Sequence, residues 1–533
     1  MALFRLFIFF YALISQISFA QPSFKKESDE WILTRQSSSR HWIKILAGIV
    51  ELELINTFGP QEKYALVRSK SRIKNTLPKE ILALQRNHPY QAFDLKDPEM
   101  GQSWGLVNTG QSIQAVGPGL AGVDVGAVKT WEFETGSKKE IVAVLDTGID
   151  LKHEDLKNNL WINKLEMLIN SLDDDHNGYI NDLNGWNFVD ENNNIQDDNN
   201  HGSAVVGVIA ADSKNGKGSR GLIENGSLMI VKILDRNGTG TTERAVRGIQ
   251  YAVKNGASVI NASWGGTLFD QVLFDTIRWA NDQGVLVICA AGNEAKDNDS
   301  DESPSYPASF QLPNIVSVAA HDSKGNLAPF SSYGKQTVHL SAPGVGIFSS
   351  VQGGYQLMNG TSFAAPFVSA VSALLKSQVP TLNPSELRSR VINTVIPMHY
   401  YLKEKLNSGG RLHSYNALKN IISPKVQSPT QWKRILKNLD TAHPYHNDTK
   451  QVFEISQPGA SHVRVHFANF DLEKQYDYVS LKDKEGLVAM TYSGKQDSFW
   501  SADVLGDTLK IEFISDFSNP QWGFAIDAFE FSP

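Results

Sequence analysis

The sequence predicts two folds in succession: an α/β domain, in which a parallel sheet is covered by helices, and then an all-β sandwich. In the middle of the 533-residue chain, apolar runs of strand length alternate with helix-like stretches, and Gly, Asn or Asp separates them. From about Lys425 the pattern changes to short segments in which apolar and polar residues alternate, such as HVRVHF and TLKIEFIS. We therefore expect the α/β domain over residues 97–424 and the sandwich over residues 425–533.

The first twenty residues have the pattern of a secretory signal peptide. Arg5 precedes an apolar run from Leu6 to Ile14, and small residues stand at Ser18 and Ala20. This run is shorter than the ~20 apolar residues that span a bilayer, so we favour cleavage after Ala20 over a membrane anchor. We therefore expect a secreted protein, extracellular or periplasmic, whose mature form has no membrane span.

Residues 21–96 are expected to form a small separate unit. The runs IVELELINTF and KYALVRS indicate short strands, and SKSRIKNTLPKE is basic and loop-like. Nothing in this stretch resembles a reaction centre, so we interpret it as an accessory segment.

The composition argues against one class of partner and one source of stability. The formal net charge of -7 provides no basic field to hold nucleic acid. The only cysteine, Cys289, lies in the apolar run VLVICAAGN and cannot form a disulfide within the chain. We expect a buried core thiol there rather than a reactive one, and we expect packing and metal ions to supply the stability.

Four apolar runs define the predicted parallel sheet. They are IVAVLD, ending at Asp146; LMIVKIL, ending at Leu234; ASVINASWGG, reaching Gly266; and VLVICAAGN, ending at Asn293. Three of them end in polar or glycine-rich residues at the C-terminal side. Ligands bind at that edge of open parallel sheets, so we expect the functional site there.

Ser362 stands in the segment NGTSFAAPFVSA, between a Gly-Thr pair and a run of small residues. A serine hydroxyl becomes a nucleophile when a base takes its proton, a third group orients the base, and donors meet the oxyanion. The small residues allow a helix to begin at Ser362, with Thr361 as its cap and Pro366 about one turn inside. Backbone N–H groups would then point toward the reaction centre.

Three other residues can supply the remaining roles. His201, in NNHGSAVVGVIAA, is the candidate base, and Asp146 ends a wholly apolar strand, where an unpartnered carboxylate would cost several kcal/mol. Asn293 follows AAG at another strand end and can direct its amide at an oxyanion, an effect on the order of 10²- to 10³-fold in rate. Each residue alone is more often structural than catalytic. The chain order Asp, His, Asn, Ser supports a catalytic triad with an oxyanion donor.

The segments VAVLDTGID, HGSAVVGVIA, VINASWGG, AAGNE and NGTSFAAP resemble, in this order, the signature segments of the subtilisin-like serine proteases. The resemblance covers about residues 97–422. It implies that Asp146 orients His201, that His201 is general base and then general acid, and that Ser362 is the nucleophile. It also implies that Asn293 and the Ser362 N–H form the oxyanion hole, and that peptide bonds are hydrolysed through an acyl-enzyme.

The sequence departs from the family pattern near the triad. Many members carry a histidine at the position of Ala204 and a threonine at that of Ser203. Neither is a triad residue, so we expect retained activity with altered local packing. Phe363 stands where methionine is common, which changes the bulk beside the nucleophile and removes an oxidisable thioether.

By the same resemblance, Ser263, Trp264, Gly265 and Gly266 form an edge to which a protein or peptide substrate adds as an extended strand. Backbone hydrogen bonds would then provide affinity, and pockets would provide preference. The side chain of Trp264 either lines the S1 or S4 region or packs in the core; the sequence leaves both open.

The loop DDDHNGYINDLNGW predicts a calcium site. It has alternating oxygen ligands around the turn residue Gly178, as in an EF-hand loop, but Asn184 stands where the twelfth-position glutamate would be. A true EF-hand is therefore not expected, and a solvated acidic loop is the alternative. Asp155 resembles another calcium ligand of the family. The ligands expected in the loop are Asp173, Asp175, Asn177, the Tyr179 carbonyl and Asp182.

The C-terminal region resembles a CUB domain, in HPYHND, FANFDLEKQYDYV and FISDFSNPQWGFAI. Calcium-binding CUB domains use an acidic triad that matches Glu473, Asp477 and Asp516. The usual cysteines are absent, which leaves calcium a larger share of the stability. This domain either binds a surface or a protein or serves only to stabilise the enzyme.

The resemblance also implies that residues 21–96 are a propeptide that assists folding, inhibits the enzyme and is cut off, with the cut between Asn87 and Gly101. The prediction as a whole is a secreted, calcium-stabilised, self-processed subtilisin-like endopeptidase with its own propeptide as a partner. Two alternatives stay open. One is a catalytically silent binding protein that acts through the CUB-like domain, and the other is a processing protease of narrow specificity.

Overall fold

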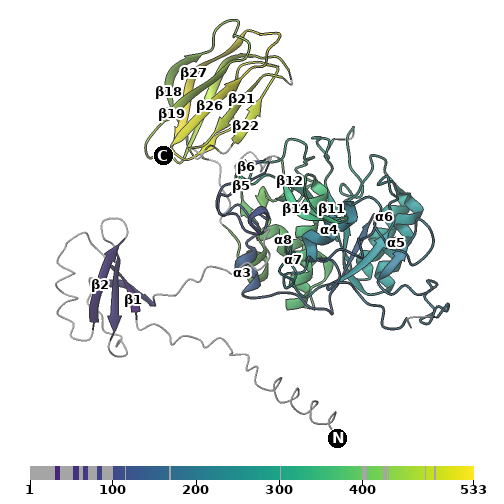
Figure 1. Cartoon of the computed structure of the whole chain (residues 1–533). Coiled ribbons are helices and arrows are strands. Elements are labelled where there is room, and N and C mark those ends of the chain that lie inside the picture. Colours follow the sequence, from purple (N-terminus) through teal and green to yellow (C-terminus); the bar gives the residue numbers. More distant parts are fainter. Residues whose placement is uncertain are drawn as a thin grey trace, which may run out of the picture. The chain divides into compact units, whose positions relative to one another are not determined.

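The structure is a computed structural model of the 533-residue chain. It describes residues 100–533 except 115, 167–169, 301, 399–404, 424–428, 430, 475, 485 and 487, together with the backbone of four strands before residue 100. The expected signal peptide, residues 1–20, lies outside the described residues. The chain divides into two compact units, Met1–Asp94 and Leu95–Pro533 (Figure 1).

The first unit contains a four-stranded antiparallel sheet in the order β2-β3-β1-β4. Strands β2 and β3 lie in the runs IVELELINTF and KYALVRS, so both predicted strands are confirmed. The other two, EWILTR and ILALQR, were not predicted. The bounds are Glu30–Arg35 for β1, Leu52–Phe58 for β2, Tyr64–Ser69 for β3 and Ile81–Arg86 for β4.

The second unit contains a nine-stranded sheet in the order β16-β17-β13-β12-β11-β10-β7-β9-β8. All neighbours pair in parallel except β16 and β17. The four predicted apolar runs supply β7, β9, β10 and β11, so the predicted parallel sheet is confirmed. The bounds are Ile141–Asp146 (β7), Gly185–Asn187 (β8), Ser227–Lys232 (β9), Ala257–Ala262 (β10), Leu286–Ala290 (β11), Ile315–His321 (β12), Leu340–Pro343 (β13), Ile396–Pro397 (β16) and Gly410–Arg411 (β17).

Helices cover both faces of this sheet, because alternate residues of a strand point to opposite faces. Val142 and Val144 of β7 pack in one apolar core with helices α4 and α7, whereas Ala143 and Leu145 pack in a second core with α5 and α6. Burial on both faces explains why the strands are continuously apolar. The helices are α3 (Ala127–Trp131), α4 (His201–Ala210), α5 (Thr242–Lys254), α6 (Gln271–Asp282), α7 (Thr361–Gln378), α8 (Pro384–Asn393) and α9 (Ser414–Lys419), with a 3-10 turn at Met100–Gln102.

An antiparallel hairpin leads into helix α7. Its strands are β14 (Ile347–Val351) and β15 (Gly354–Met358), and Val351 pairs with Gly354 across a two-residue turn. Four residues after Met358 the chain reaches Ser362. A second small ribbon pairs β5 (Ser112–Ile113) with β6 (Gly117–Pro118).

The C-terminal region is an all-antiparallel sandwich, so the predicted change of fold is confirmed. One sheet has the order β18-β27-β20-β23, with β24 and β25 also paired to β20, and the other has the order β19-β26-β21-β22. Its core contains Phe467, Phe470, Phe513 and Phe524. The strands are β18 (Lys433–Asp440), β19 (Lys450–Ser456), β20 (His462–Asp471), β21 (Tyr478–Lys482), β22 (Val488–Tyr492), β23 (Lys495–Gln496), β24 (Phe499–Trp500), β25 (Val504–Leu505), β26 (Thr508–Ile514) and β27 (Gly523–Ser532).

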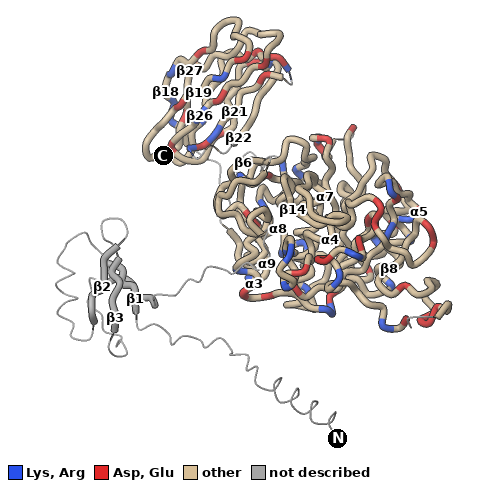
Figure 2. Tube along the Cα trace, viewed as in Figure 1, with Lys and Arg blue, Asp and Glu red and all other residues tan. Residues whose placement is uncertain are grey.

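Basic and acidic residues are interspersed over the second unit (Figure 2). Many form exposed pairs, as Arg247 does with Glu191 at 2.7 Å and with Glu243 at 2.8 Å. Such pairs contribute about 0–1 kcal/mol each. None of the helices in the described part of the chain has the length and apolar character needed to cross a membrane.

Candidate active site

Asp146 is the last residue of β7, and its side chain is 1% exposed. Its Oδ1 accepts a hydrogen bond from the backbone N–H of Thr147 at 2.7 Å. The apolar run before it explains the burial, because both faces of β7 lie under helices. A carboxylate in this position needs a polar partner.

His201 provides that partner as the first residue of α4. Its Nδ1 donates to Asp146 Oδ1 at 2.8 Å, which leaves Nε2 for another group. Burial lowers the pKa of His201, but the charge and hydrogen bond of Asp146, together with the charge of Asp197, outweigh it and raise the pKa. The predicted acid and base are therefore adjacent, although they are 55 residues apart in the chain.

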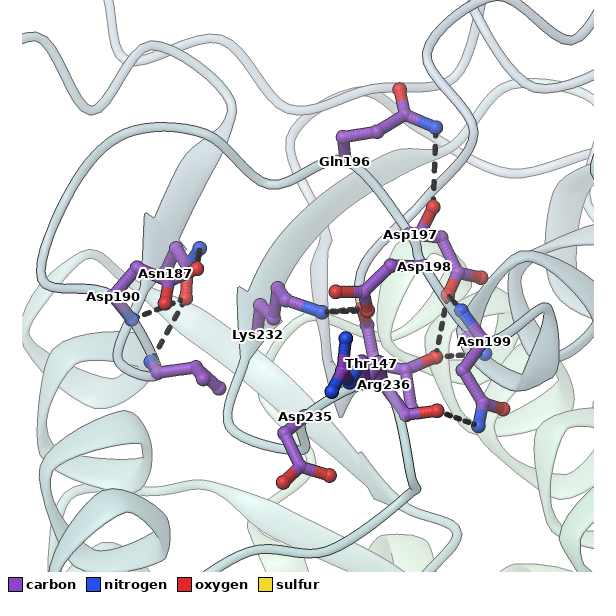
Figure 3. A network of polar contacts seen from close by, with 12 residues as sticks. Thr147, Asn187, Asp190, Gln196, Asp197, Asp198, Asn199, Lys232, Asp235 and Arg236 are labelled. Atoms are coloured by element: carbon purple, nitrogen blue, oxygen red, sulfur yellow. Dashed lines mark hydrogen bonds and ion pairs between the residues drawn. The ribbon is translucent and has the colours of Figure 1, made fainter.

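Asp197 organises the start of α4, and sequence reasoning did not single it out. Its buried carboxylate accepts from the hydroxyl groups of Thr147 at 2.9 Å and Ser203 at 2.6 Å. It also accepts from the backbone N–H groups of Asn199, Asn200 and Ser203. Burial raises its pKa, but these donors outweigh burial and lower it. A fixed negative charge is thus held near His201, whose pKa it raises. Figure 3 shows the contacts of Asp197 with Thr147 and Asn199.

Lys232 adds a cation to the same network (Figure 3). Its side chain is 2% exposed, and its Nζ donates to the Thr147 carbonyl at 2.5 Å and to Asp198 Oδ1 at 2.6 Å. The ammonium group therefore ties the chain just after Asp146 to the chain just before His201.

Ser362 is the second residue of α7, which begins at Thr361 with Gly360 as its N-cap. The prediction that Thr361 caps this helix is wrong, because Thr361 is helical and makes no side-chain cap. The Ser362 hydroxyl donates to the Ser263 carbonyl at 3.2 Å, and among the described contacts none joins it to His201. The adjacent Phe363 ring lies 5.3 Å from the His201 imidazole, centroid to centroid, so the predicted base is a neighbour of the segment that carries Ser362.

Asn293 follows β11, and the start of α7 fixes its amide. Its Oδ1 accepts from the Thr361 backbone N–H at 2.9 Å and lies 3.0 Å from the Thr361 hydroxyl. The Nδ2 group has no hydrogen-bond partner among the described residues and stays available as a donor. Asn293 and Ser362 line one hollow of about 180 Å³.

The predicted substrate edge borders this hollow. Ser263 to Gly266 follow β10 and line it, and Gly266 exchanges backbone hydrogen bonds with Tyr306 at 2.8 and 2.7 Å. Trp264 also lines a second hollow of about 390 Å³ beside Gly238 and Leu268, and it packs against the second apolar core. Core packing of Trp264 is therefore confirmed, and its assignment to the S1 or S4 region stays a prediction.

The loop predicted to bind calcium brings together three carboxylates: Glu166, Asp173 and Asp175. Glu166 was not predicted, because it precedes the loop motif in sequence. Asp182 is fully buried and accepts from Tyr251 Oη at 2.5 Å; burial raises its pKa to about 6.

The other residues expected in that loop lie beside the three carboxylates. Asn177 directs its Nδ2 to Asp175 and Asp182 at 3.0 Å, and its Oδ1 accepts from the Tyr179 N–H at 2.8 Å. Asp155, by contrast, holds the loop after α4, since it accepts from Asn215 at 2.5 Å and from the Ser219 N–H at 3.1 Å.

The sandwich brings together the three acids predicted there. Carboxylate oxygens of Glu473, Asp477 and Asp516 lie within 4.8 Å of one another. Tyr445 Oη donates to Asp477, and Glu473 Oε2 is buried without a hydrogen-bond partner among the described residues. An orphaned buried carboxylate oxygen beside two further carboxylates is the donor set that a hard divalent cation takes.

Two family models match the chain. One, described as the subtilase family, matches residues 137–422, and one described as the CUB domain matches residues 428–528. A thermophilic serine proteinase of Bacillus sp. (strain AK1) is 35% identical over 54% of this chain and 64% of its own length. Thermitase of Thermoactinomyces vulgaris is 32% identical over 55% of this chain and 93% of its own, and subtilisin DY of Bacillus licheniformis is 34% identical over 50% and 88%.

Proposed function

Since the chain belongs to the subtilase family, we propose that it is a serine endopeptidase that uses Asp146, His201 and Ser362 as its triad. The observation that carries the proposal is the 2.8 Å hydrogen bond between His201 Nδ1 and Asp146 Oδ1. It leaves Nε2 free of Asp146, and the ring of Phe363, the residue after Ser362, lies 5.3 Å from the imidazole, which suits a general base for Ser362.

The first chemical step is acylation of Ser362. The Ser362 hydroxyl turns from the Ser263 carbonyl to His201 Nε2, gives up its proton there and attacks the scissile carbonyl. His201 then passes this proton to the leaving amine, and water repeats the sequence on the acyl-enzyme. Asp146 stabilises the imidazolium that forms in both halves of the reaction.

The oxyanion of each tetrahedral intermediate is stabilised by two donors, Asn293 Nδ2 and the backbone N–H of Ser362. Helix α7 supports this arrangement, because its N-terminal N–H groups favour negative charge. Thr361 holds the Oδ1 atom of Asn293, which leaves Nδ2 as the donor for this role.

The substrate adds as an extended strand to the edge Ser263 to Gly266. The hollow lined by Ser263, Asn293 and Ser362 then receives the P1 side chain, and the hollow between Trp264 and Leu268 receives a side chain further from the cleaved bond. Protein or peptide substrates are the class that this geometry fits.

The enzyme is secreted and processes itself. Two features support this proposal: the signal-like first twenty residues and the separate four-stranded unit before residue 87, which suits a propeptide. The cleavage lies between Asn87 and Gly101.

Calcium stabilises the protein at two places. In the sandwich, Glu473, Asp477 and Asp516 would hold the ion, and the orphaned Glu473 Oε2 supports this assignment. In the loop, Glu166, Asp173 and Asp175 are the core of the donor set, with Asn177, the Tyr179 carbonyl and Asp182 as further oxygen ligands. The role is structural: the cation offsets the repulsion between clustered carboxylates.

Removing calcium is expected to lower the melting temperature of the sandwich. A ligand present at 100 times its Kd contributes about 2.7 kcal/mol, which corresponds to roughly 10 °C or more in a domain of this size. Calorimetry with and without a chelator tests this. Glu473→Gln should make the unfolding transition of the sandwich insensitive to calcium. Glu454→Gln, on the exposed face of β19, should leave its calcium dependence unchanged. Equal calcium dependence in the two variants would contradict the assignment.

The test of the proposed function is intact-mass analysis and N-terminal sequencing of wild type and Ser362→Ala, each produced with the N-terminal segment in calcium. We expect the wild type to lose its N-terminal unit and Ser362→Ala to keep it. If both are trimmed alike, or both stay full length, Ser362 does no chemistry on this chain. The alternative of a binding protein acting through the sandwich would then replace the peptidase.

A further inference from the structure

The residue before the general base, Asn200, has a backbone conformation that few residues adopt. Its φ is 93°, in the left-handed region, where asparagine is among the few tolerated residues besides glycine. Asn200 is the N-cap residue of α4, but its side chain makes no cap hydrogen bond. The backbone of Asn200 therefore sets the direction in which the chain enters α4 at His201.

The Asn200 side chain is held from a distant part of the chain. Its Oδ1 accepts from the backbone N–H of Gln352 at 2.9 Å, and the Gln352 side-chain amide donates to the Asp197 carbonyl. The N–H of Gly353 approaches Asp150 Oδ2 at 3.4 Å. Gln352 and Gly353 form the two-residue turn of the β14–β15 hairpin.

The hairpin is itself fixed along its length. Ser349 Oγ donates to the Ala204 carbonyl in α4 at 2.7 Å, and His153 Nε2 lies 2.8 Å from the Gly354 carbonyl. The Tyr355 ring packs edge-to-face on His153 at 5.0 Å. One rigid element thus touches the segment before the base and runs directly into the segment of the nucleophile, Ser362.

We propose that Asn200 is a positioning residue for His201 and that the Gln352–Gly353 turn holds it through the Asn200 Oδ1 atom. The hairpin then couples the placement of the base to that of the nucleophile. The kinetic part of this inference rests on the proposed peptidase function. The imidazole must meet Asp146 on Nδ1 and Ser362 on Nε2 together, and an error of about 1 Å in such an arrangement can cost on the order of 10²-fold in rate.

Substitutions of Asn200 separate its backbone conformation from its hydrogen bond. Asn200→Gly tolerates the positive φ but removes the acceptor, whereas Asn200→Asp keeps both the acceptor and a side chain suited to this region. We expect Asn200→Gly to lower kcat about tenfold with KM within twofold of wild type. Asn200→Asp should keep most of the wild-type kcat. Asn200→Ala should lose more kcat than Asn200→Gly, because alanine adds backbone strain at this positive φ.

The donor can be removed from the other side without breaking the turn. Gly353 has a φ of 72° and Gln352 is not among the residues of positive φ, which is the pattern of a type II turn that accepts proline at its first central position. Gln352→Pro therefore removes the N–H donor, whereas Gln352→Ala keeps it. Of the two Gln352 variants, we expect only Gln352→Pro to show the loss of kcat seen in Asn200→Gly. The double variant that combines Asn200→Gly with Gln352→Pro should lose no more kcat than either single variant.

A second readout does not depend on turnover. We follow the low-field proton NMR signal of the His201–Asp146 hydrogen bond in the Ser362→Ala background. This signal should shift or broaden when Asn200→Gly or Gln352→Pro is added, and it should be unchanged when Asn200→Asp is added. Asn420→Ala is the matched control, because Asn420 has a φ of 54° at the C-terminal end of α9 and its backbone N–H is bonded within that helix.

Two results would overturn the proposal: an unchanged signal in both Asn200→Gly and Gln352→Pro, or an Asn200→Asp variant as impaired as Asn200→Gly. If the wild type shows no Ser362-dependent hydrolysis, the peptidase function fails and the NMR comparison alone decides on Asn200.

Discussion

Replacing Asp146 with asparagine is expected to lower kcat about 10⁴-fold, the loss found when the orienting aspartate of a serine protease triad is replaced. Asp146 is buried and holds His201 Nδ1 at 2.8 Å, so an amide there no longer stabilises the imidazolium. KM should change little, because Asp146 does not line the substrate hollows. Steady-state kinetics on a peptide substrate measures both constants.

The same variant should change the pH dependence. Activity is lost as the pH falls through the pKa of His201, because the protonated imidazole accepts no proton. Asp146 raises that pKa, so Asp146→Asn should move the acidic limb of kcat/KM to lower pH. Asp197 also raises the pKa of His201 and is unchanged in this variant. Asp146→Asn should therefore remove only part of the increase in that pKa. A limb that stays in place would show that another group controls it.

Replacing Asn293 with alanine is expected to lower kcat on the order of 10²- to 10³-fold while leaving KM within a few fold. Its Nδ2 group lines the hollow and has no hydrogen-bond partner among the described residues, and the oxyanion forms only after substrate has bound. Asn293→Asp should be no better, because it keeps the contact with Thr361 but places negative charge near the oxyanion.

The matched control for this prediction is Asn298→Ala. Asn298 lines the same hollow, but its amide donates to the Ala291 carbonyl at 2.8 Å. Its replacement should reduce stability, seen as a lower melting temperature, and should lower kcat less than tenfold. Equal losses of kcat in the two variants would mean that packing, not the oxyanion, explains the role of Asn293.

Local sequence patterns predicted most of the framework. The apolar runs ending at Asp146 and Asn293 are the strands β7 and β11, because a strand buried on both faces must be apolar throughout. Alternation after Lys425 predicted the sandwich, because one face of each strand is buried. The three acids of the sandwich were predicted as a cluster and lie within 4.8 Å of one another.

The features that sequence reasoning missed depend on contacts between distant segments. Glu166 joins the acidic loop only because the chain folds back, and it carries no motif of its own. The cap of α7 was misplaced by one residue, because Thr361 is engaged by Asn293 and Gly360 alone tolerates the required backbone. Asp197 is one acid in an Asn- and Asp-rich stretch, and only its five donors distinguish it.

By itself, the sequence determined the two folds, the order of the strands along the chain and the chemical types available at the edge of the sheet, because periodicity and residue type are local properties. Only the tertiary structure decided that Asp146 and His201 share a hydrogen bond, and that Gln352 of a hairpin, 152 residues away, donates to Asn200 just before His201. Such contacts depend on how the packed elements meet in space. Their geometry exists only once the core has formed.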